Sequence, residues 1–295
     1  MRVVIAGSSG LLGTSLVPAL RQGKHEVIRL VRREPEAPDE RGWDPARGHL
    51  DDGALHGAEA VINLCGAGIG DKRWTEQRKR ELVSSRTQAT TVLARAVAEQ
   101  GIPALLNASA VGYYGDTGDE QVTEDSGSGS GFLADMCRQW EQATAPAADG
   151  GARVALLRSG LVLSPAGGLL GPLKPLFKLM LGGRIGSGRQ YMPWISLDDE
   201  VSAIRFVLEN PELSGPVNVT GPVPVTNVEF THALATALGR PAPWVVPGFA
   251  LRAVLGEFAD EGALVGQRAI PAKLIEHGYP FQHPTLEAAL AAVAP

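Results

Sequence analysis

Residues 3–13 read VVIAGSSGLLG, and this stretch decides the fold of the chain. Its apolar start predicts a β-strand, and the residues after it predict a helix over 11–22 whose apolar face carries Leu16, Val17 and Leu20. The three glycines between them predict a tight turn that backbone or a pyrophosphate can approach closely. The helix would meet such phosphates with its free N–H groups and the positive end of its dipole.

This turn predicts a dinucleotide site. Gly7 permits the turn, Gly10 lets backbone approach the pyrophosphate, and Gly13 lets the helix pack closely on the strand. A strand–helix turn without a ligand is the alternative. The predicted cofactor contacts in this stretch are Gly7, Ser9, Gly10, Leu11, Leu12 and Gly13.

The end of the second predicted strand distinguishes NAD from NADP. The run HEVIRLV, residues 25–31, arrives roughly 20 residues after the glycines, as this unit requires. An NAD site usually carries Asp or Glu here, whereas this chain carries Arg32 and Arg33. A guanidinium can pair bidentately with a 2′-phosphate. The sequence therefore favours NADP(H), bound through Arg32, over NAD(H) and over a merely solvated turn.

Composition and motifs exclude several other classes of protein function. The chain has 295 residues, of which 44% are hydrophobic, and a net charge of −5, which argues against nucleic acid as a partner. Its basic run, 72–80, is typical of a solvated helix face. The six histidines show no metal-ligand spacing, so we expect no metal site. The serine-hydrolase Gly-x-Ser-x-Gly elbow and the P-loop Lys-Ser/Thr are absent.

Sequence features also predict the compartment. Two cysteines, Cys65 and Cys137, make no disulfide framework, and we expect both to be reduced and buried. No apolar stretch reaches membrane-spanning length, and the first strand begins at residue 2, which leaves no room for a signal peptide. We therefore expect a cytoplasmic protein without a membrane partner. The sequence leaves open whether it forms a homodimer.

Strand-like and helical runs alternate along the chain, which predicts a parallel sheet with right-handed crossovers. Residues 34–52 are polar and are predicted to be a surface connection, and residues 120–131 a loop. The predicted strands are 3–6, 26–31, 60–64, 104–108 and 154–157, and the predicted helices are 11–22, 75–100, 131–148 and 173–181.

The composition changes after Leu163, where proline and glycine interrupt the pattern. We predict an α/β chain with a Rossmann-type, doubly wound parallel sheet and a smaller C-terminal substrate lobe. The NADP-binding domain would comprise residues 1–163 with about 196–221, and the lobe residues 164–195 and 222–295. The active cleft would lie between them.

Motifs along the whole chain resemble those of the extended short-chain dehydrogenase/reductases, in particular the NAD(P)-dependent epimerase/dehydratase group and its SDR39U1-like subfamily. The most subfamily-specific of these motifs lies near the C-terminus. The motifs are Gly7–Gly13, Trp43-Asp44-Pro45 with Gly48, Asn63–Gly66, Arg73-Trp74, Ser85-Arg86, Tyr113-Tyr114-Gly115, Arg158-Ser159-Gly160, Gly186–Gly188, Pro193-Trp194-Ile195, Asp198-Asp199, Gly266-Gln267-Arg268 with Pro271, and Gly278-Tyr279.

The resemblance implies further cofactor contacts. At the end of the predicted strand 60–64, Leu64, Cys65 and Gly66 would wall the ribose side of the cofactor. From the long helix, Arg86 would reach the cofactor, with Glu81 as a weaker candidate. Plain turn chemistry for the glycines and a surface salt bridge for Arg86 are the alternatives. After the predicted strand 154–157, Gly160 and Val162 would flank the nicotinamide end.

The chain departs from the superfamily at its catalytic helix. The reductases place Tyr and Lys four residues apart on one helix face, where the lysine lowers the tyrosine pKa. Residues 132–138, FLADMCR, contain neither residue, so Phe132 and Met136 or Leu133 and Cys137 occupy the two positions. Asp135 has no clear role there.

Two hydroxyls remain as catalytic candidates. Ser109 matches the family's Ser/Thr, and Tyr114 lies five residues further on, where it could act as a substitute acid or simply pack in the cleft wall.

Two functions follow. The first is an NADP(H)-dependent oxidoreductase or epimerase-like enzyme for a small polar substrate, with a sugar among the candidates, whose substrate side would be lined by 186–189 and Trp194. The second is a catalytically inactive NADPH-binding sensor or regulatory protein. The missing Tyr/Lys pair supports the second.

Overall fold

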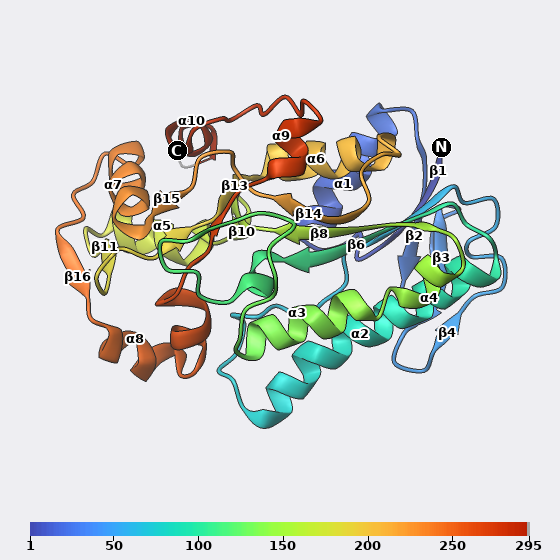
Figure 1. Ribbon diagram of the computed structural model, residues 1–295, viewed down its shortest axis with the longest axis horizontal. Helices are drawn as coiled ribbons and strands as arrows, with labels where there is room; N and C mark the ends of the chain where they lie inside the picture. The colour runs from blue at the N-terminus through green and yellow to red at the C-terminus, as the bar shows by residue number, and fades with distance from the viewer. Residues whose placement is uncertain (294–295) are drawn as a thin grey trace.

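A mostly parallel sheet runs through the centre of the computed structural model, which describes residues 1–293 (Figure 1). Its eight strands in that part of the chain have the spatial order β14-β8-β6-β5-β1-β2-β3-β4, and only the short β4 runs antiparallel to its neighbour. The strands are β1 (Arg2–Ala6), β2 (Glu26–Val31), β3 (Glu40–Asp44), β4 (His49–Leu50), β5 (Ala60–Asn63), β6 (Ala104–Ala110), β8 (Arg153–Ser159) and β14 (Gly215–Val219). The predicted doubly wound fold class is confirmed.

The order in which the chain adds strands to the sheet reverses beside β1. From β1 the chain crosses first to β2 and β3 on one side and then to β5, β6 and β8 on the other. A crevice opens where the connections diverge, outside the carboxyl ends of the strands. The glycine turn, which directly follows β1, therefore lies in the crevice where such sheets bind their ligands.

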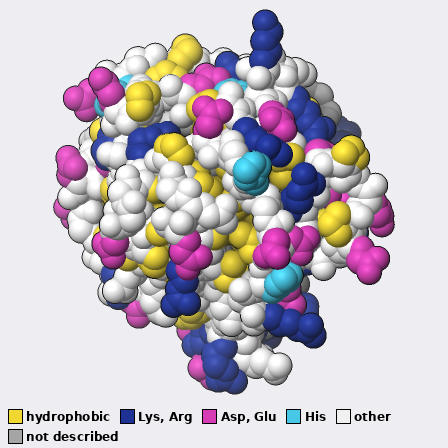
Figure 2. Space-filling model, turned by 90° about the vertical axis from the view of Figure 1, so that its right-hand side faces the viewer, with side chains coloured by type: hydrophobic (Ala, Val, Ile, Leu, Met, Phe, Trp, Pro, Cys, Tyr) yellow, Lys and Arg dark blue, Asp and Glu magenta, His cyan; other side chains and the backbone are white. Residues whose placement is uncertain are grey.

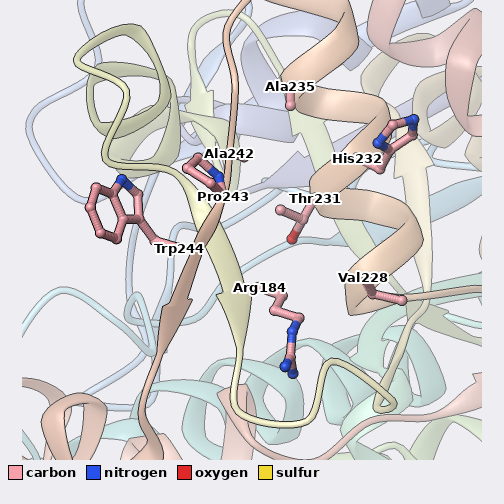
Figure 3. Close-up of a pocket in the computed structure, with 8 residues that line it drawn as sticks. All are labelled: Arg184, Val228, Thr231, His232, Ala235, Ala242, Pro243 and Trp244. Carbon is pink, nitrogen blue, oxygen red and sulfur yellow. The ribbon is translucent and has the colours of Figure 1, made fainter.

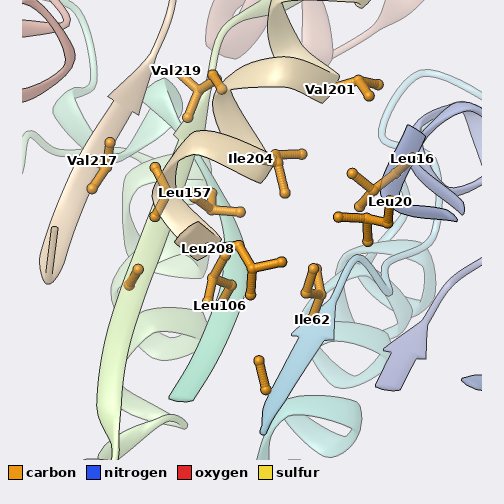
Figure 4. Close-up of a cluster of buried hydrophobic side chains, with 14 of the residues drawn as sticks. Leu16, Leu20, Ile62, Leu106, Leu157, Val201, Ile204, Leu208, Val217 and Val219 are labelled. Atoms are coloured by element: carbon orange, nitrogen blue, oxygen red, sulfur yellow. The ribbon is translucent and has the colours of Figure 1, made fainter. Parts of the chain in front are cut away.

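Helices cover both faces of the sheet (Figure 1). On one face, α1 (Leu11–Gln22) and α6 (Leu197–Glu209) pack against each other over a cluster of fully buried aliphatic residues. Figure 4 shows this cluster, in which Leu16 and Leu20 of α1 point toward α6. The other face is covered by α2 (Glu76–Glu99), α3 (Phe132–Gln142) and α4 (Ala145–Asp149).

Two local predictions need correction. Residues 34–52 are not only a surface connection, because they contain β3, which extends the sheet beyond β2. The buried Trp43 and Glu40 anchor that strand, and its polar sequence concealed it. The helix predicted over 131–148 is two helices, α3 and α4. The helix is interrupted at Thr144, which is the N-cap of α4. Pro146 follows two residues later and has no N–H for an intrahelical hydrogen bond.

The C-terminal residues build small sheets and helices around the carboxyl ends of the central strands. Parallel strands β9 (Leu161–Ser164) and β13 (Trp194–Ser196) form the base. The helices α7 (Asn227–Ala237) and α10 (Leu286–Val293) pack on a cluster around Trp194 and Phe230. The other elements are β7 (Gln121–Val122), β10 (Gly167–Gly168), α5 (Leu170–Lys178), β11 (Gly183–Ile185), β12 (Tyr191–Met192), β15 (Val225–Thr226), β16 (Trp244–Val246), α8 (Gly248–Leu255), β17 (Arg268–Ala269) and α9 (Ala272–Glu276), with the 3₁₀ helix η1 (Val111–Tyr114) and the π-helix η2 (Ala259–Ala263).

The C-terminal segment is fastened at two places, to the segment that follows β6 and to helix α6, which covers the central sheet. Strand β17 pairs with β7, and Gln267 Nε2 donates to the Gly115 carbonyl at 2.6 Å. The buried Asp199 of α6 accepts hydrogen bonds from the backbone N–H groups of Gln282 and His283 and from the Tyr279 hydroxyl. The motifs near Gly266 and Tyr279 thus fasten the end of the chain across the sheet.

Candidate cofactor cleft

A cleft with a volume of about 1030 Å³ lies at the carboxyl ends of β1, β2 and β5. It combines the glycine turn, the arginines after β2, the loop after β5 and one face of α2. Eight predicted contacts line it: Gly7, Ser9, Gly10, Arg32, Leu64, Cys65, Gly66 and Glu81. The structure thus brings together residues from four separate parts of the sequence.

The three positions of the turn require glycine for different structural reasons. Gly7 has φ +86°, and a Cβ on Gly13 would lie 2.3 Å from the Gly7 carbonyl oxygen, so the fold itself requires both glycines. A Cβ on Gly10 would meet only that oxygen, at 3.4 Å. Gly10 is the N-cap of α1, and the first N–H groups of this helix lack intrahelical partners. The open space at Gly10 fits a pyrophosphate.

Leu11 and Leu12, the other predicted contacts of this turn, do not line the cleft. Leu12 packs against the aliphatic cluster beneath α1. Leu11 lies under the β9–β10 turn, within 3.4 Å of the place where a Cβ on Gly168 would be. Their contribution to a cofactor stays a prediction.

The three arginines at the end of β2 differ in their partners. Arg29 binds Asp39 through two hydrogen bonds of 2.8 and 3.1 Å, and these bonds lower the pKa of that carboxyl to about 2. Arg33 binds the buried carboxylate of Glu40 at 2.7 and 2.9 Å. Among the described residues, the exposed Arg32 has no hydrogen-bond or ion-pair partner. Its charge is therefore available to an anion in the cleft.

Two side chains, Asn63 and Arg86, hold the loop after β5 through hydrogen bonds to its backbone. Asn63 Oδ1 accepts the Cys65 N–H at 3.1 Å, and Arg86 Nη2 donates to the Ala67 carbonyl at 3.0 Å. Arg86 is buried, stacks over Trp140 and has its pKa lowered to about 10 by that burial. It does not line the cleft. Arg86 therefore supports the loop and forms no surface salt bridge within the described chain, and its contact with a cofactor stays a prediction.

The two cysteines are free, but only Cys137 is buried as predicted. Cys65 is half-buried and lines the cleft. Burial raises the pKa of its thiol to about 12, and the nearby charge of Arg32 opposes that shift. Cys65 is thus a neutral wall residue within the electrostatic reach of Arg32.

Gly160 and Val162 lie at the far side of the sheet edge and do not line this cleft. A Cβ on Gly160 would lie 2.1 Å from the Pro193 carbonyl oxygen, so strand packing alone requires this glycine. Val162 packs at the rim of the aliphatic cluster, as do Leu12 and Leu64. Contact of either residue with a nicotinamide stays a prediction.

The two predicted catalytic hydroxyls are committed to a buried polar network. Ser109 Oγ donates to Glu141 Oε1 at 2.6 Å. Tyr114 is 3% exposed, its hydroxyl donates to Asn218 at 2.7 Å, and it accepts from Arg158 Nη1 at 3.0 Å. Burial raises the pKa of Tyr114. This geometry favours the packing alternative for Tyr114 over a role as a catalytic acid.

Helix α3, which lacks the Tyr/Lys pair, packs against η1 at the end of β6. A Cβ on Gly112 of η1 would lie 3.6 Å from Leu133 Cβ and 3.9 Å from Cys137 Sγ. Leu133 and Cys137 thus face η1, and Phe132, Leu133 and Met136 belong to the cluster around Trp74, so both assignments of the two positions stay open. Neither side chain at these positions can relay a proton at neutral pH, since burial raises the pKa of Cys137 to about 12.

Sequence reasoning missed several wall residues. Ser84, Ser85 and Gln88 share with Glu81 the face of α2 that lines the cleft. Their helical spacing was the available signal. From the polar segment after β2, Glu40 and Trp43 also line it, but only the pairing of β3 places them there.

A smaller pocket of about 240 Å³ lies in the C-terminal residues between α7 and β16 (Figure 3). Thr231 faces the strands, whereas His232 and Trp244 point away from each other on opposite sides (Figure 3). Its polar groups therefore do not converge on one point. Among residues 1–293, no group of three potential ligands could hold a metal ion.

Surface properties add two observations. No helix among the described residues is both long and apolar enough to cross a membrane. On the face shown in Figure 2, basic and acidic side chains are intermingled and form no continuous basic field.

Comparisons with known proteins agree with this architecture. Residues 3–220 match the NAD dependent epimerase/dehydratase family, and residues 246–293 match a domain of unknown function, DUF1731. An epimerase family protein of Mycobacterium bovis is 54% identical over 288 residues, which cover 98% of this chain and 96% of the relative. The human epimerase family protein SDR39U1 is 35% identical over 98% of both chains.

Solved structures give the same result. The crystal structure of human SDR39U1 (isoform 2) with NADPH has a TM-score of 0.91 at 34% identity and covers 100% of this chain and 99% of that one. A nucleoside-diphosphate sugar epimerase from Corynebacterium glutamicum has a TM-score of 0.83 at 38% identity, over 99% of this chain and 58% of that one. The Thermus thermophilus UDP-glucose 4-epimerase with NAD, at 18% identity and TM-score 0.77, shares the fold.

Proposed function

This chain belongs to the NAD dependent epimerase/dehydratase family, and we propose that it binds NADP(H) in the cleft beside the glycine turn and uses it on a small polar substrate. The observation that carries the proposal is the free Arg32 between two arginines that are already paired. A 2′-phosphate would satisfy this charge, whereas a 2′-hydroxyl would leave it unpaired. The NADPH in the human SDR39U1 structure supports this choice of cofactor.

The residues present fit the cofactor. The space that a Cβ on Gly10 would fill lies at the N-terminus of α1, where backbone N–H groups can receive the pyrophosphate. Leu64, Cys65 and Gly66 would wall the ribose, and Arg32 would hold the 2′-phosphate. When bound, the nicotinamide ring supplies or accepts hydride.

Binding is tested first and separately from turnover. We expect NADPH and 2′,5′-ADP to bind, and NADH to bind about 10-fold to 100-fold more weakly than NADPH, since a charge-assisted hydrogen bond contributes about 1.5–3 kcal/mol. Isothermal titration of the purified chain with each ligand measures this. Equal affinity for NADH and NADPH would contradict the proposal.

A second function is favoured by one specific observation. The hydroxyls of Ser109 and Tyr114 are both held in the network around Glu141 and Arg158, and α3 carries neither Tyr nor Lys. The chain would then be an NADPH-binding sensor or regulatory protein without turnover. Following NADPH absorbance against a broad panel of carbonyl substrates distinguishes the two, because any turnover decides for the enzyme. A cytoplasmic location and a homodimer remain predictions.

A further inference from the structure

One buried carboxylic acid has a free oxygen and bonds to Ser159, the neighbour of Gly160, which is a predicted nicotinamide contact. Glu200 of α6 is 0% exposed, and its Oε2 has no hydrogen-bond partner among the described residues. Its Oε1 accepts a hydrogen bond of 2.5 Å from Ser159 Oγ. An unpaired carboxyl oxygen in an interior is costly, so a protein retains it only where packing or function requires it.

Ser159 links this acid to the carboxyl edge of the sheet. It is the last residue of β8, next to Gly160, and it is half-buried. Side chains alternate along a strand, so Arg158 points to the face of α3 and Glu141, while Ser159 points to the face of α6. That is the face whose rim carries Leu12, Leu64 and Val162, all predicted cofactor contacts.

The ionisable groups buried near Glu200 form hydrogen bonds with other partners. Asp199, which precedes Glu200, accepts hydrogen bonds from Tyr279 and from the backbone of His283, and His283 Nδ1 bonds Ser196. Arg158 lies on the opposite face of the sheet. Thr220 Oγ1, buried beside Gly160, also lacks a partner. Asp198, in the same turn, is exposed, so Glu200 is the buried acid at this end of α6 that retains a free oxygen.

We propose that Glu200 and Ser159 form the proton-transfer pair of this protein, in place of the absent Tyr/Lys pair, and this rests on the proposed use of NADP(H). In the reductive direction, the substrate carbonyl carbon receives hydride and is reduced, while its oxygen takes the proton of Ser159 Oγ. Ser159 Oγ in turn takes the proton of neutral Glu200, which is left as a carboxylate. The oxidative direction reverses each transfer, and the nicotinamide is the redox partner in both.

The protonation state of Glu200 agrees with this role. Burial raises its pKa to about 8, although the hydrogen bond from Ser159 lowers it. The acid is therefore mostly neutral at pH 7 and can give a proton, and a pKa near the working pH suits a group that exchanges protons.

The experiment follows the carboxyl carbon of Glu200 by NMR of protein labelled at glutamate, with Glu200→Gln to assign the resonance. The free protein, the 2′,5′-ADP complex, the NADPH complex and the NADP⁺ complex are titrated with pH. If the pair lies at the nicotinamide end, the positive ring of NADP⁺ lowers the Glu200 midpoint by about one pH unit relative to NADPH. The fragment 2′,5′-ADP, which has no ring, leaves it unchanged.

Two variants separate this role from a structural one. Ser159→Ala removes the hydrogen bond that lowers the Glu200 pKa, so we expect a higher midpoint with NADPH affinity within about twofold of the parent. The matched control is Glu124→Gln, because Glu124 is also buried with an unpartnered Oε2 but contacts Asn218 and Lys273. In this control the response of Glu200 to NADP⁺ should persist.

The outcomes are distinct. If NADP⁺ and NADPH bind but give the same Glu200 midpoint, the proton-transfer role is overturned and the cofactor proposal stands. If neither dinucleotide binds, both proposals fail. If any substrate is found, Glu200→Gln and Ser159→Ala should each lower kcat at least tenfold with unchanged KM for NADPH, and full activity in either would overturn the role.

Discussion

Arg158 and Glu141 form a bidentate ion pair in the interior, with Nε–Oε1 and Nη2–Oε2 distances of 2.8 and 2.9 Å. Their side chains are 2% and 10% exposed. The pair joins β8 to α3, and it also receives Ser109 and Tyr114. Four polar side chains, from β8, α3, β6 and η1, thus satisfy one another's hydrogen-bonding groups beneath the edge of the sheet.

Glu141→Ala should destabilise the protein by about 3 kcal/mol or more, because it leaves the Arg158 charge buried and unpaired. Urea unfolding followed by circular dichroism measures the change. The matched control is Asp135→Ala in the same helix, since Asp135 pairs with Arg138 at an exposed position, where the loss should be under about 1 kcal/mol. Equal effects of the two substitutions would contradict the assignment.

Tyr114→Phe tests the two interpretations of that tyrosine. The structure predicts a stability loss of about 1–2 kcal/mol with unchanged NADPH affinity, because Asn218 and Arg158 each lose a partner. A catalytic acid would instead lower the rate by roughly 10²–10⁴. Denaturant unfolding and single-turnover NADPH oxidation, measured on the same preparation, decide between them.

Arg32→Ala should weaken NADPH binding by about one to two orders of magnitude and leave NADH nearly unchanged. The physical reason is the loss of the one guanidinium in this group of three without a partner on the described chain. Arg47→Ala is a suitable control, because Arg47 is exposed and does not line the cleft. Equal losses for both cofactors after Arg32→Ala would refute the assignment.

Gly10→Val should abolish dinucleotide binding while the protein stays folded. The new side chain would fill the space at the N-terminus of α1 and would meet no backbone atom closer than 3.4 Å at its Cβ. Gly13→Ala is the opposite case, because its Cβ would lie 2.3 Å from the Gly7 carbonyl oxygen and force the helix off the strand. Calorimetric binding with thermal unfolding separates the two, and normal NADPH binding by Gly10→Val would exclude this turn as the cradle.

Glu200 predicts a pH dependence of stability. Its folded-state pKa of about 8 lies above its ordinary value of 4.5, so the folded state holds a proton that the unfolded state releases between these values. Stability should therefore fall as pH rises through this window, by at most about 1.4 kcal/mol per unit. Glu200→Gln should remove that slope. Urea unfolding at pH 5, 6.5 and 8 measures it, and identical slopes in parent and variant would contradict the prediction.

Sequence alone determined the local chemistry. Apolar periodicity and glycine spacing placed β1, α1 and β2, because a strand, a turn and a helix each depend on residues close together in the chain. The same patterns indicated the cofactor turn around Gly10 and the arginines after β2. They also showed that the helix at 132–138 lacks Tyr and Lys.

Tertiary structure decided which of these groups is free to act. Arg29 and Arg33 look equivalent to Arg32 in the sequence, and only the pairing of β3 with β2 brings Glu40 to Arg33. The partners of Tyr114 lie 44 and 104 residues away along the chain, a separation that no local pattern encodes. Whether a polar side chain is available depends on such distant neighbours, because burial and hydrogen bonding are properties of the packed chain.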